Sequence, residues 1–140
     1  MSELSLLTPA LALICWTLVM WVWMYATRIP AMQKQKIDAG TLKTASDLEV
    51  LPMSVRQIAE NYNHLHEQPV IFYALAVYAH MQGLVNEVTV MAAWAYVVLR
   101  IIHSVFQATV NFVPVRFVIF VLSSLCLFLI AGIQVGALFA

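Results

Sequence analysis

Hydrophobic residues occur along the chain in four long runs that are separated by short polar stretches. A helix needs roughly 20 mostly apolar residues to cross a bilayer. Three of the runs reach this length directly, and the second reaches it if its helix begins near Ser54, just after Pro52. We expect membrane-spanning helices at about residues 6–27, 54–83, 87–110 and 115–138. The pattern predicts an all-α membrane protein, a four-transmembrane-helix bundle that forms a single domain over residues 1–140.

The composition agrees with a chain whose main solvent is lipid. Hydrophobic residues account for 63% of the chain and charged residues for 10%. A soluble domain carries about 25% charged residues, so this chain has too few to cover a water-facing surface. The formal net charge is +0, which argues against nucleic-acid binding because such a surface needs clustered Lys and Arg.

The basic residues gather on one side of the predicted bundle. The connection between the first and second helices, with the residues beside it, contains Arg28, Lys34, Lys36, Lys43 and Arg56. Arg116 lies near the connection between the third and fourth helices, which is on the same side. The opposite connection and the two ends of the chain have no Lys or Arg. The positive-inside rule therefore places both basic connections in the cytoplasm and both termini outside.

Polar residues inside the predicted helices form two stripes. The second helix carries Arg56, Glu60, Asn63 and Glu67, and the third carries Tyr96, Arg100, His103, Gln107 and Asn111. At about 100° per residue, each set shares one helix face. If the second and third helices run antiparallel and are joined by a turn near position 85, Glu67 lies at about the same depth as His103. Arg100 is then one helical turn away from that depth. A lone charge inside a membrane is costly, so we expect Glu67 to pair with Arg100 in the same subunit.

Three explanations of these stripes are open. Polar side chains can join helices by hydrogen bonds, they can line a path for protons or ions, or they can bind a polar ligand from the cytoplasmic side. Neutral side chains join helices at lower desolvation cost, so the charges favour the ligand site. We expect it to be lined by Asn63, Glu67, Arg100, His103, Gln107 and Arg116.

A metal site is a weaker interpretation of the same region. The candidate ligands are His64, His66, Glu67 and His103. His64 and His66 are two positions apart and would point to different faces of one helix. The His-x-x-x-His spacing of a helical metal site is absent, so we expect no metal.

Two stretches of the sequence resemble a known family. They are NHLHEQPVIFY, from Asn63 to Tyr73, and LRIIHS, from Leu99 to Ser104. With the four spans and the chain length, they resemble the membrane-associated proteins in eicosanoid and glutathione metabolism, the MAPEG family. The resemblance covers essentially the whole chain and is closest to the bacterial members, which implies a bacterial inner membrane.

The resemblance implies a homotrimer of four-helix bundles that binds glutathione between subunits, near the cytoplasmic side. Better-known members conjugate glutathione to lipophilic electrophiles, reduce lipid hydroperoxides or isomerise lipid mediators, and one member binds lipid without catalysis. Glutathione-binding members carry Arg-x-x-x-Asn-x-x-Glu before a proline. Aligned on Asn63 and Pro69, this chain has Ala59 at the Arg position and His66 at the Glu position.

The resemblance implies a membrane-bound glutathione-dependent transferase or peroxidase that acts on lipophilic substrates. Arg116 would favour the thiolate and His103 would donate a hydrogen bond or a proton. The ligand-binding residues would be Arg56, Asn63, Glu67, Arg100 and Gln107, with the arginines holding carboxylates. Two alternatives are open: a non-catalytic lipid-binding or accessory subunit, and an unrelated ligand in the same pocket.

Overall fold

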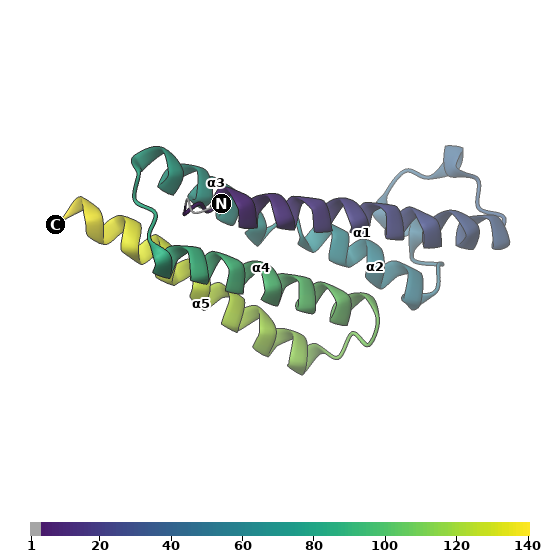
Figure 1. The fold of residues 1–140 in the computed structure, drawn as a ribbon. Helices are drawn as coiled ribbons and strands as arrows, with labels where there is room; N and C mark the ends of the chain where they lie inside the picture. The colour runs from purple at the N-terminus through teal and green to yellow at the C-terminus, as the bar shows by residue number, and fades with distance from the viewer. Residues whose placement is uncertain (1–3) are drawn as a thin grey trace.

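The computed structural model describes residues 4–140, and the regular structure in this range is helical (Figure 1). The elements are α1 Leu7–Lys34, η1 Ala39–Thr41, η2 Ala45–Leu48, α2 Met53–His64, α3 Gln68–Gln82, α4 Glu87–Ala108 and α5 Val113–Leu138. Of these, α1, α4 and α5 are each long and apolar enough to cross a membrane. The helices α2 and α3 follow one another and make the remaining pass, so the four-pass bundle fits the structure.

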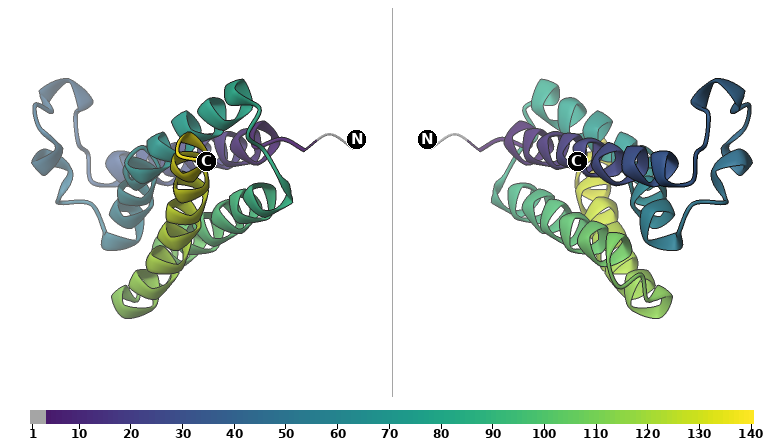
Figure 2. Two further views of the ribbon diagram at one scale, coloured as in Figure 1. Left: turned by 90° about the vertical axis from the view of Figure 1, so that its left-hand side faces the viewer. Right: turned by 90° about the vertical axis from the view of Figure 1, so that its right-hand side faces the viewer.

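Both connections that carry basic residues lie at the same end of the molecule. Figure 1 shows the loop between α1 and α2 and the turn between α4 and α5 at one end, with both termini and the α3–α4 turn at the other. Viewed more nearly along the helices, the α1–α2 loop extends to one side of the bundle (Figure 2). The most extensive packing is between α4 and α5, and α1 contacts α2, α3 and α4.

The second pass is interrupted, which corrects the expected continuous helix over residues 54–83. The helix α2 ends at His64 and α3 begins at Gln68. Pro69, in the first turn of α3, has no N–H to bond to the carbonyl of Leu65. Glu67, at the junction, has φ −95° and ψ −96°, outside the helical region. The break separates the residues on either side of it into two helical registers.

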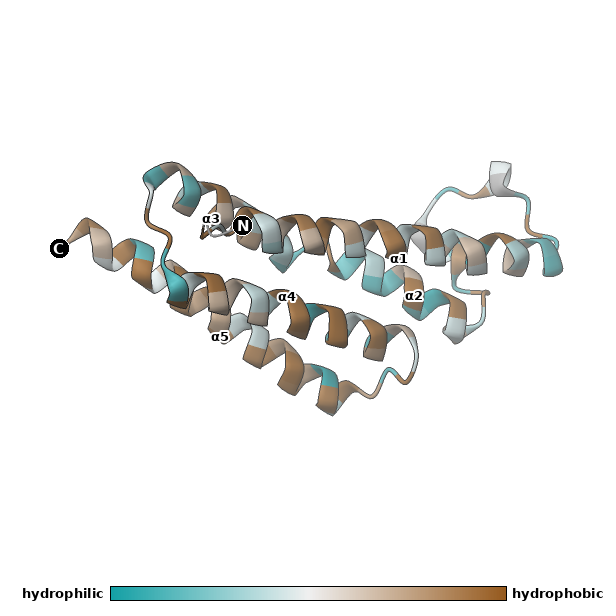
Figure 3. Ribbon diagram, in the orientation of Figure 1, coloured by the Kyte–Doolittle hydropathy of each residue, from teal (hydrophilic) through white to brown (hydrophobic). Residues whose placement is uncertain are grey.

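Apolar side chains both fill the core and cover the outside. Leu13, Met20 and Ala93 are fully buried, whereas Leu18 and Phe128 are 60% and 75% exposed. Figure 3 shows hydrophobic residues along most of α1, α4 and α5, with hydrophilic residues gathered on α2 and the adjoining loop. Exposed apolar side chains of this extent suit a lipid-facing surface.

Candidate functional site

Neutral polar side chains occupy the face of α2 that packs against α4. Gln57 and Asn61 are 7% and 0% exposed. Gln57 Nε2 donates to the carbonyl oxygens of Ala108 and Thr109 at 3.0 and 2.8 Å, and Asn61 Nδ2 donates to Ser104 Oγ. The two Gln57 bonds satisfy carbonyls at the end of α4, which have no partner inside their own helix. The neutral amides thus join α2 to α4.

The same face continues beyond these two amides. His64 ends α2, and its ring centroid lies 5.1 Å from that of His103 on α4. Gln68 begins α3, accepts a hydrogen bond from Tyr96 Oη at 3.2 Å and donates to Ser124 Oγ at 2.9 Å. We call Gln57, Asn61, His64 and Gln68 the neutral stripe. Its members have the same spacing as the expected charged stripe, displaced by one residue.

The charged stripe of α2 does not face α4, which corrects the expectation that the two predicted stripes meet. This stripe consists of Arg56, Glu60, Asn63 and Glu67; Arg56 is partly buried and the other three are exposed. One residue is about 100° around a helix, so the two stripes cannot both face α4. Burying the charged stripe would cost more desolvation free energy than burying neutral amides, so the neutral stripe faces α4.

The polar stripe of α4 is buried as far as the helix extends. Tyr96, Arg100, His103 and Gln107 are 0%, 0%, 3% and 5% exposed. Asn111 does not belong to this stripe, contrary to expectation, because α4 ends at Ala108. Its φ of 54° places it in the left-handed region, which Asn tolerates better than most residues, within the turn to α5.

The expected ion pair between Glu67 and Arg100 is absent from the described chain, residues 4–140. The Arg100 atoms Nε, Nη1 and Nη2 are buried and have no hydrogen-bond partner there. The guanidinium carbon lies 5.4 Å from the Phe120 ring centroid and 6.0 Å from that of Tyr96. The break after His64 leaves the Glu67 side chain 68% exposed, with its Oε1 3.5 Å from His64 Nδ1.

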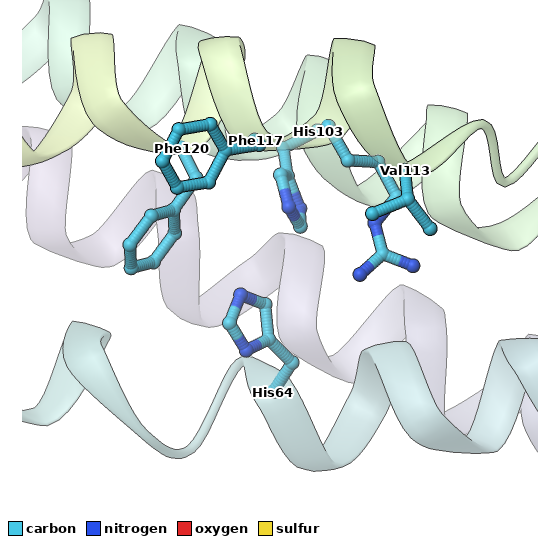
Figure 4. A pocket seen from close by; sticks show the side chains of 6 residues that line it. His64, His103, Val113, Phe117 and Phe120 are labelled. Atoms are coloured by element: carbon cyan, nitrogen blue, oxygen red, sulfur yellow. The ribbon is translucent and has the colours of Figure 1, made fainter.

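A cavity of about 220 Å³ lies between the end of α2, α4 and the start of α5. We call it the histidine cavity, and its lining consists of His64, His103, Val113, Arg116, Phe117 and Phe120. The two histidine side chains point toward each other across it, and the two phenylalanines lie to one side (Figure 4). The lining therefore combines proton-accepting rings, one guanidinium and an aromatic wall.

The neutral stripe positions the cation of this cavity. Arg116 Nη1 donates to Asn111 Oδ1, and Asn111 Nδ2 donates to Gln57 Oε1 at 3.2 Å. Gln57 is in turn bonded to the end of α4. This chain of bonds from α2 through the α4–α5 turn holds Arg116 at the start of α5, beside the histidines.

A second cavity, of about 210 Å³, lies on another side of α2. We call it the loop cavity; it is lined by Arg28, Ser46, Leu48, Glu49, Leu51, Arg56, Ala59, Glu60 and Asn63. The structure thus divides the predicted site residues. His103 and Arg116 line the histidine cavity, whereas Arg56 and Asn63 line the loop cavity. Gln107 is buried but lines neither.

The sequence-based prediction does not include most members of the neutral stripe. It leaves out Gln57, Asn61 and Gln68 and considers His64 only as a metal ligand. The periodicity of these residues is a signal in the sequence, because they recur at i, i+4, i+7 and i+11. The adjacent stripe has the same periodicity and carries the charges, so charge alone favours the wrong face.

Comparison with known proteins adds one match. A model described as the MAPEG family matches residues 6–136, which is nearly the whole chain. No curated protein and no solved structure matches the chain.

Proposed function

This chain belongs to the MAPEG family, as the sequence resemblance indicated, and from that premise we propose a membrane-bound glutathione-dependent transferase or peroxidase that acts on lipophilic substrates. Family membership and the apolar helices make the protein a multi-pass integral membrane protein with a glutathione-related role in general. The particular reaction, the residues that carry it out and the oligomeric state of the protein are what we propose.

The histidine cavity is the observation that carries the proposal. A thiol reacts as the thiolate, which a nearby cation stabilises, and Arg116 supplies such a cation. Phe117 and Phe120 add an aromatic wall in the same cavity, suited to a lipophilic second substrate. One small space therefore offers the two environments that thiol addition to an apolar molecule requires.

Arg100 supports an anionic ligand. Its guanidinium is fully buried, and its three side-chain nitrogen atoms lack hydrogen-bond partners within residues 4–140. A buried charge without a counter-ion is strongly unfavourable, so such a group is retained where a ligand supplies the anion. Glutathione carries two carboxylates, and Arg binds carboxylates by paired hydrogen bonds. Arg56 lines the loop cavity, on another side of α2, so within one subunit it is not beside Arg100.

A homotrimer is part of the proposal. The two cavities, at about 220 and 210 Å³, are each smaller than the roughly 300 Å³ at which ligand pockets begin. Glu60, Asn63 and Glu67 form an exposed polar edge on the second pass, which lipid cannot satisfy. A neighbouring subunit would enlarge the site and cover this edge. Native mass spectrometry in mild detergent should show a trimer, and a predominant monomer would contradict it.

The orientation is also proposed: a bacterial inner membrane with both basic connections in the cytoplasm. Single cysteines placed by Gly40→Cys or Val85→Cys, with Cys15 and Cys126 replaced by Ala, test it. An impermeant maleimide should label position 85 in intact cells and spare position 40. Labelling of position 40 alone would reverse the orientation.

The ligand is tested by calorimetric titration of glutathione into the purified assembly. Wild type should bind, and Arg100→Ala should bind less tightly; because Arg100 has no ion-pair partner in residues 4–140, its loss strands no counter-ion. Lys34→Gln, an exposed cation at the end of α1, is the matched control and should bind as wild type does. Absence of binding by wild type would favour the non-catalytic lipid-binding alternative. Unchanged binding by Arg100→Ala would move the carboxylate site to the loop cavity.

A further inference from the structure

His64 lines the histidine cavity, and the proposed reaction as described so far gives it no role. It is the last residue of α2, and its side chain, 23% exposed, lines the histidine cavity. Its ring points into this cavity toward His103 (Figure 4). One ring nitrogen, Nδ1, lies 3.5 Å from Glu67 Oε1. The other nitrogen, Nε2, makes no hydrogen bond within residues 4–140 and is available to a substrate in the cavity.

We propose that His64 is the catalytic base that removes the thiol proton and that Glu67 is the positioning residue that orients its ring. This assignment rests on the proposed function, because it names the base for the same thiol substrate. Activated nucleophiles commonly pair with a base that a third group orients, and a carboxylate on the distal ring nitrogen is the usual orienter.

The end of α2 places the two side chains together. His64 ends the helix, Glu67 follows three residues later at the junction with α3, and the turn between them is closed by hydrogen bonds from the His66 and Glu67 N–H groups. Side chains three residues apart in a helical turn are neighbours, and the Glu67 carboxylate reaches the His64 ring. The 3.5 Å separation is slightly longer than a good hydrogen bond, and such contacts shorten when substrate binds.

The charges around His64 explain why a carboxylate is needed. Among the described elements around the cavity, α4 contributes His103 and Arg100 nearby, and α5 contributes Arg116; α1 contributes no lining residue. The two arginines favour a thiolate but oppose a second positive charge on His64. Glu67 is the one anionic group in contact with this ring within residues 4–140, so it stabilises the imidazolium.

The proton balance of the step is complete without any redox partner. His64 Nε2 takes the proton as the S–H bond breaks, and the bonding pair stays on sulfur. Sulfur then forms a bond to the β carbon of a conjugated carbonyl compound, whose π pair moves toward the carbonyl. The imidazolium returns its proton to the α carbon, and His64 is neutral again.

His66 provides a matched control two residues away. It is exposed, its Nδ1 lies 2.9 Å from the Tyr62 carbonyl oxygen, and it does not line the histidine cavity. His66→Gln therefore makes the same chemical change as His64→Gln on the same segment without touching the proposed base. Glu67→Gln keeps a polar side chain of nearly the same size, so it should assemble even where His64→Gln does not.

The test measures glutathione binding by calorimetry, bound thiolate by its ultraviolet absorbance, and kcat for addition to an enone across a pH series. His64→Gln should bind glutathione but lower kcat at neutral pH by about 10²–10⁴-fold, the range expected for a lost general base. Glu67→Gln should shift thiolate formation upward by about one pH unit, a tenfold loss per unit at neutral pH, and Glu67→Asp should restore it. His66→Gln should match wild type.

The outcomes separate this assignment from the proposed function. If wild type binds no glutathione, the proposed function fails and the base assignment with it. If glutathione binds and Glu67→Gln leaves the thiolate titration and kcat unchanged, the assignment alone is overturned, and the arginines suffice to ionise the thiol. A loss of kcat equal in His64→Gln and His66→Gln would likewise overturn it.

Discussion

The two polar stripes on the second pass have the same spacing, but one is largely buried and the other is largely exposed. The neutral stripe is turned toward α4, where Gln57 and Asn61 make buried hydrogen bonds. The charged stripe, displaced by one residue, lies at the edge and partly lines the loop cavity. Amides can satisfy helix ends and hydroxyls at a small desolvation cost, whereas charges cannot. One face of α2 thus joins it to α4 and ends at the histidine cavity, and the other remains exposed beside the loop cavity.

Arg100 is an exception to the rule that the charged residues stay exposed. It is charged, yet it is fully buried on α4. It makes no ion pair within residues 4–140, so it does not join helices as the neutral stripe does. A buried charge of this kind is costly, and this cost is the reason that we propose an anionic ligand for it.

Among the predictions that test this comparison, the largest effect is expected from removing Arg116, the cation that the neutral stripe positions. Arg116→Ala should lower the turnover of glutathione addition by about 10²–10³-fold, as for loss of one group that stabilises developing negative charge. Arg116→Lys should retain more activity because it keeps the charge. Steady-state assays at saturating glutathione measure both, with Lys34→Gln as the exposed-cation control. Equal turnover in Arg116→Ala and wild type would exclude Arg116 from the reaction.

The next effect is on stability and compares adjacent residues of the two stripes. Gln57→Leu should lower the free energy of unfolding by about 1–3 kcal/mol, because the Ala108 and Thr109 carbonyls and the Asn111 amide lose their buried partner. Arg56→Leu, on the charged stripe, should change it by less than about 0.5 kcal/mol. Unfolding in mixed detergent micelles measures both. A larger loss for Arg56→Leu would reverse the roles of the stripes.

A smaller effect is expected from the two asparagines of α2. Asn61→Leu removes the bond to Ser104 and should cost about 0.6–1.7 kcal/mol, the range for one hydrogen bond between membrane helices. Asn63→Leu makes the same change at an exposed position and should be close to neutral for stability. The same unfolding assay serves, and equal losses in the two variants would show that Asn61 has no special structural role.

The smallest expected effect is on the stability of the loop between α1 and α2, around Asp47. Hydrogen bonds from the Lys43 and Thr44 N–H groups to Asp47 Oδ2, at 2.8 and 3.1 Å, hold the pKa of Asp47 below its usual range. A lowered folded-state pKa stabilises the loop above about pH 4 and loses this effect as the pH falls through it. Amide exchange at Lys43 and Thr44 should quicken in acid, relative to the intrinsic rate, while the buried amides of α4 stay protected. Asp47→Asn should weaken the same protection at neutral pH.

Much of the fold was predictable because it depends on local properties of the chain. The long apolar runs predicted the helical passes, and the cations predicted that the two basic connections share one end. The sequence also predicted one pocket that contains His103 and Arg116, and both residues line the histidine cavity. The predicted alignment of the second and third passes along the bundle was close to the observed one. His103 was expected opposite position 67, and it lies opposite His64.

The amino-acid sequence by itself determined the membrane-spanning class, the family and the presence of polar stripes, because hydrophobic run length and residue identity carry that information. Tertiary structure decided which stripe on α2 is buried. Two stripes with equal spacing differ only by rotation of the helix, and periodicity alone cannot choose between rotations. Glu67, at the break before Pro69, lies beside His64 and makes no ion pair with Arg100 within residues 4–140. Which stripe is buried depends on the total desolvation cost of all the groups in contact. Those contacts form only when the helices pack against one another.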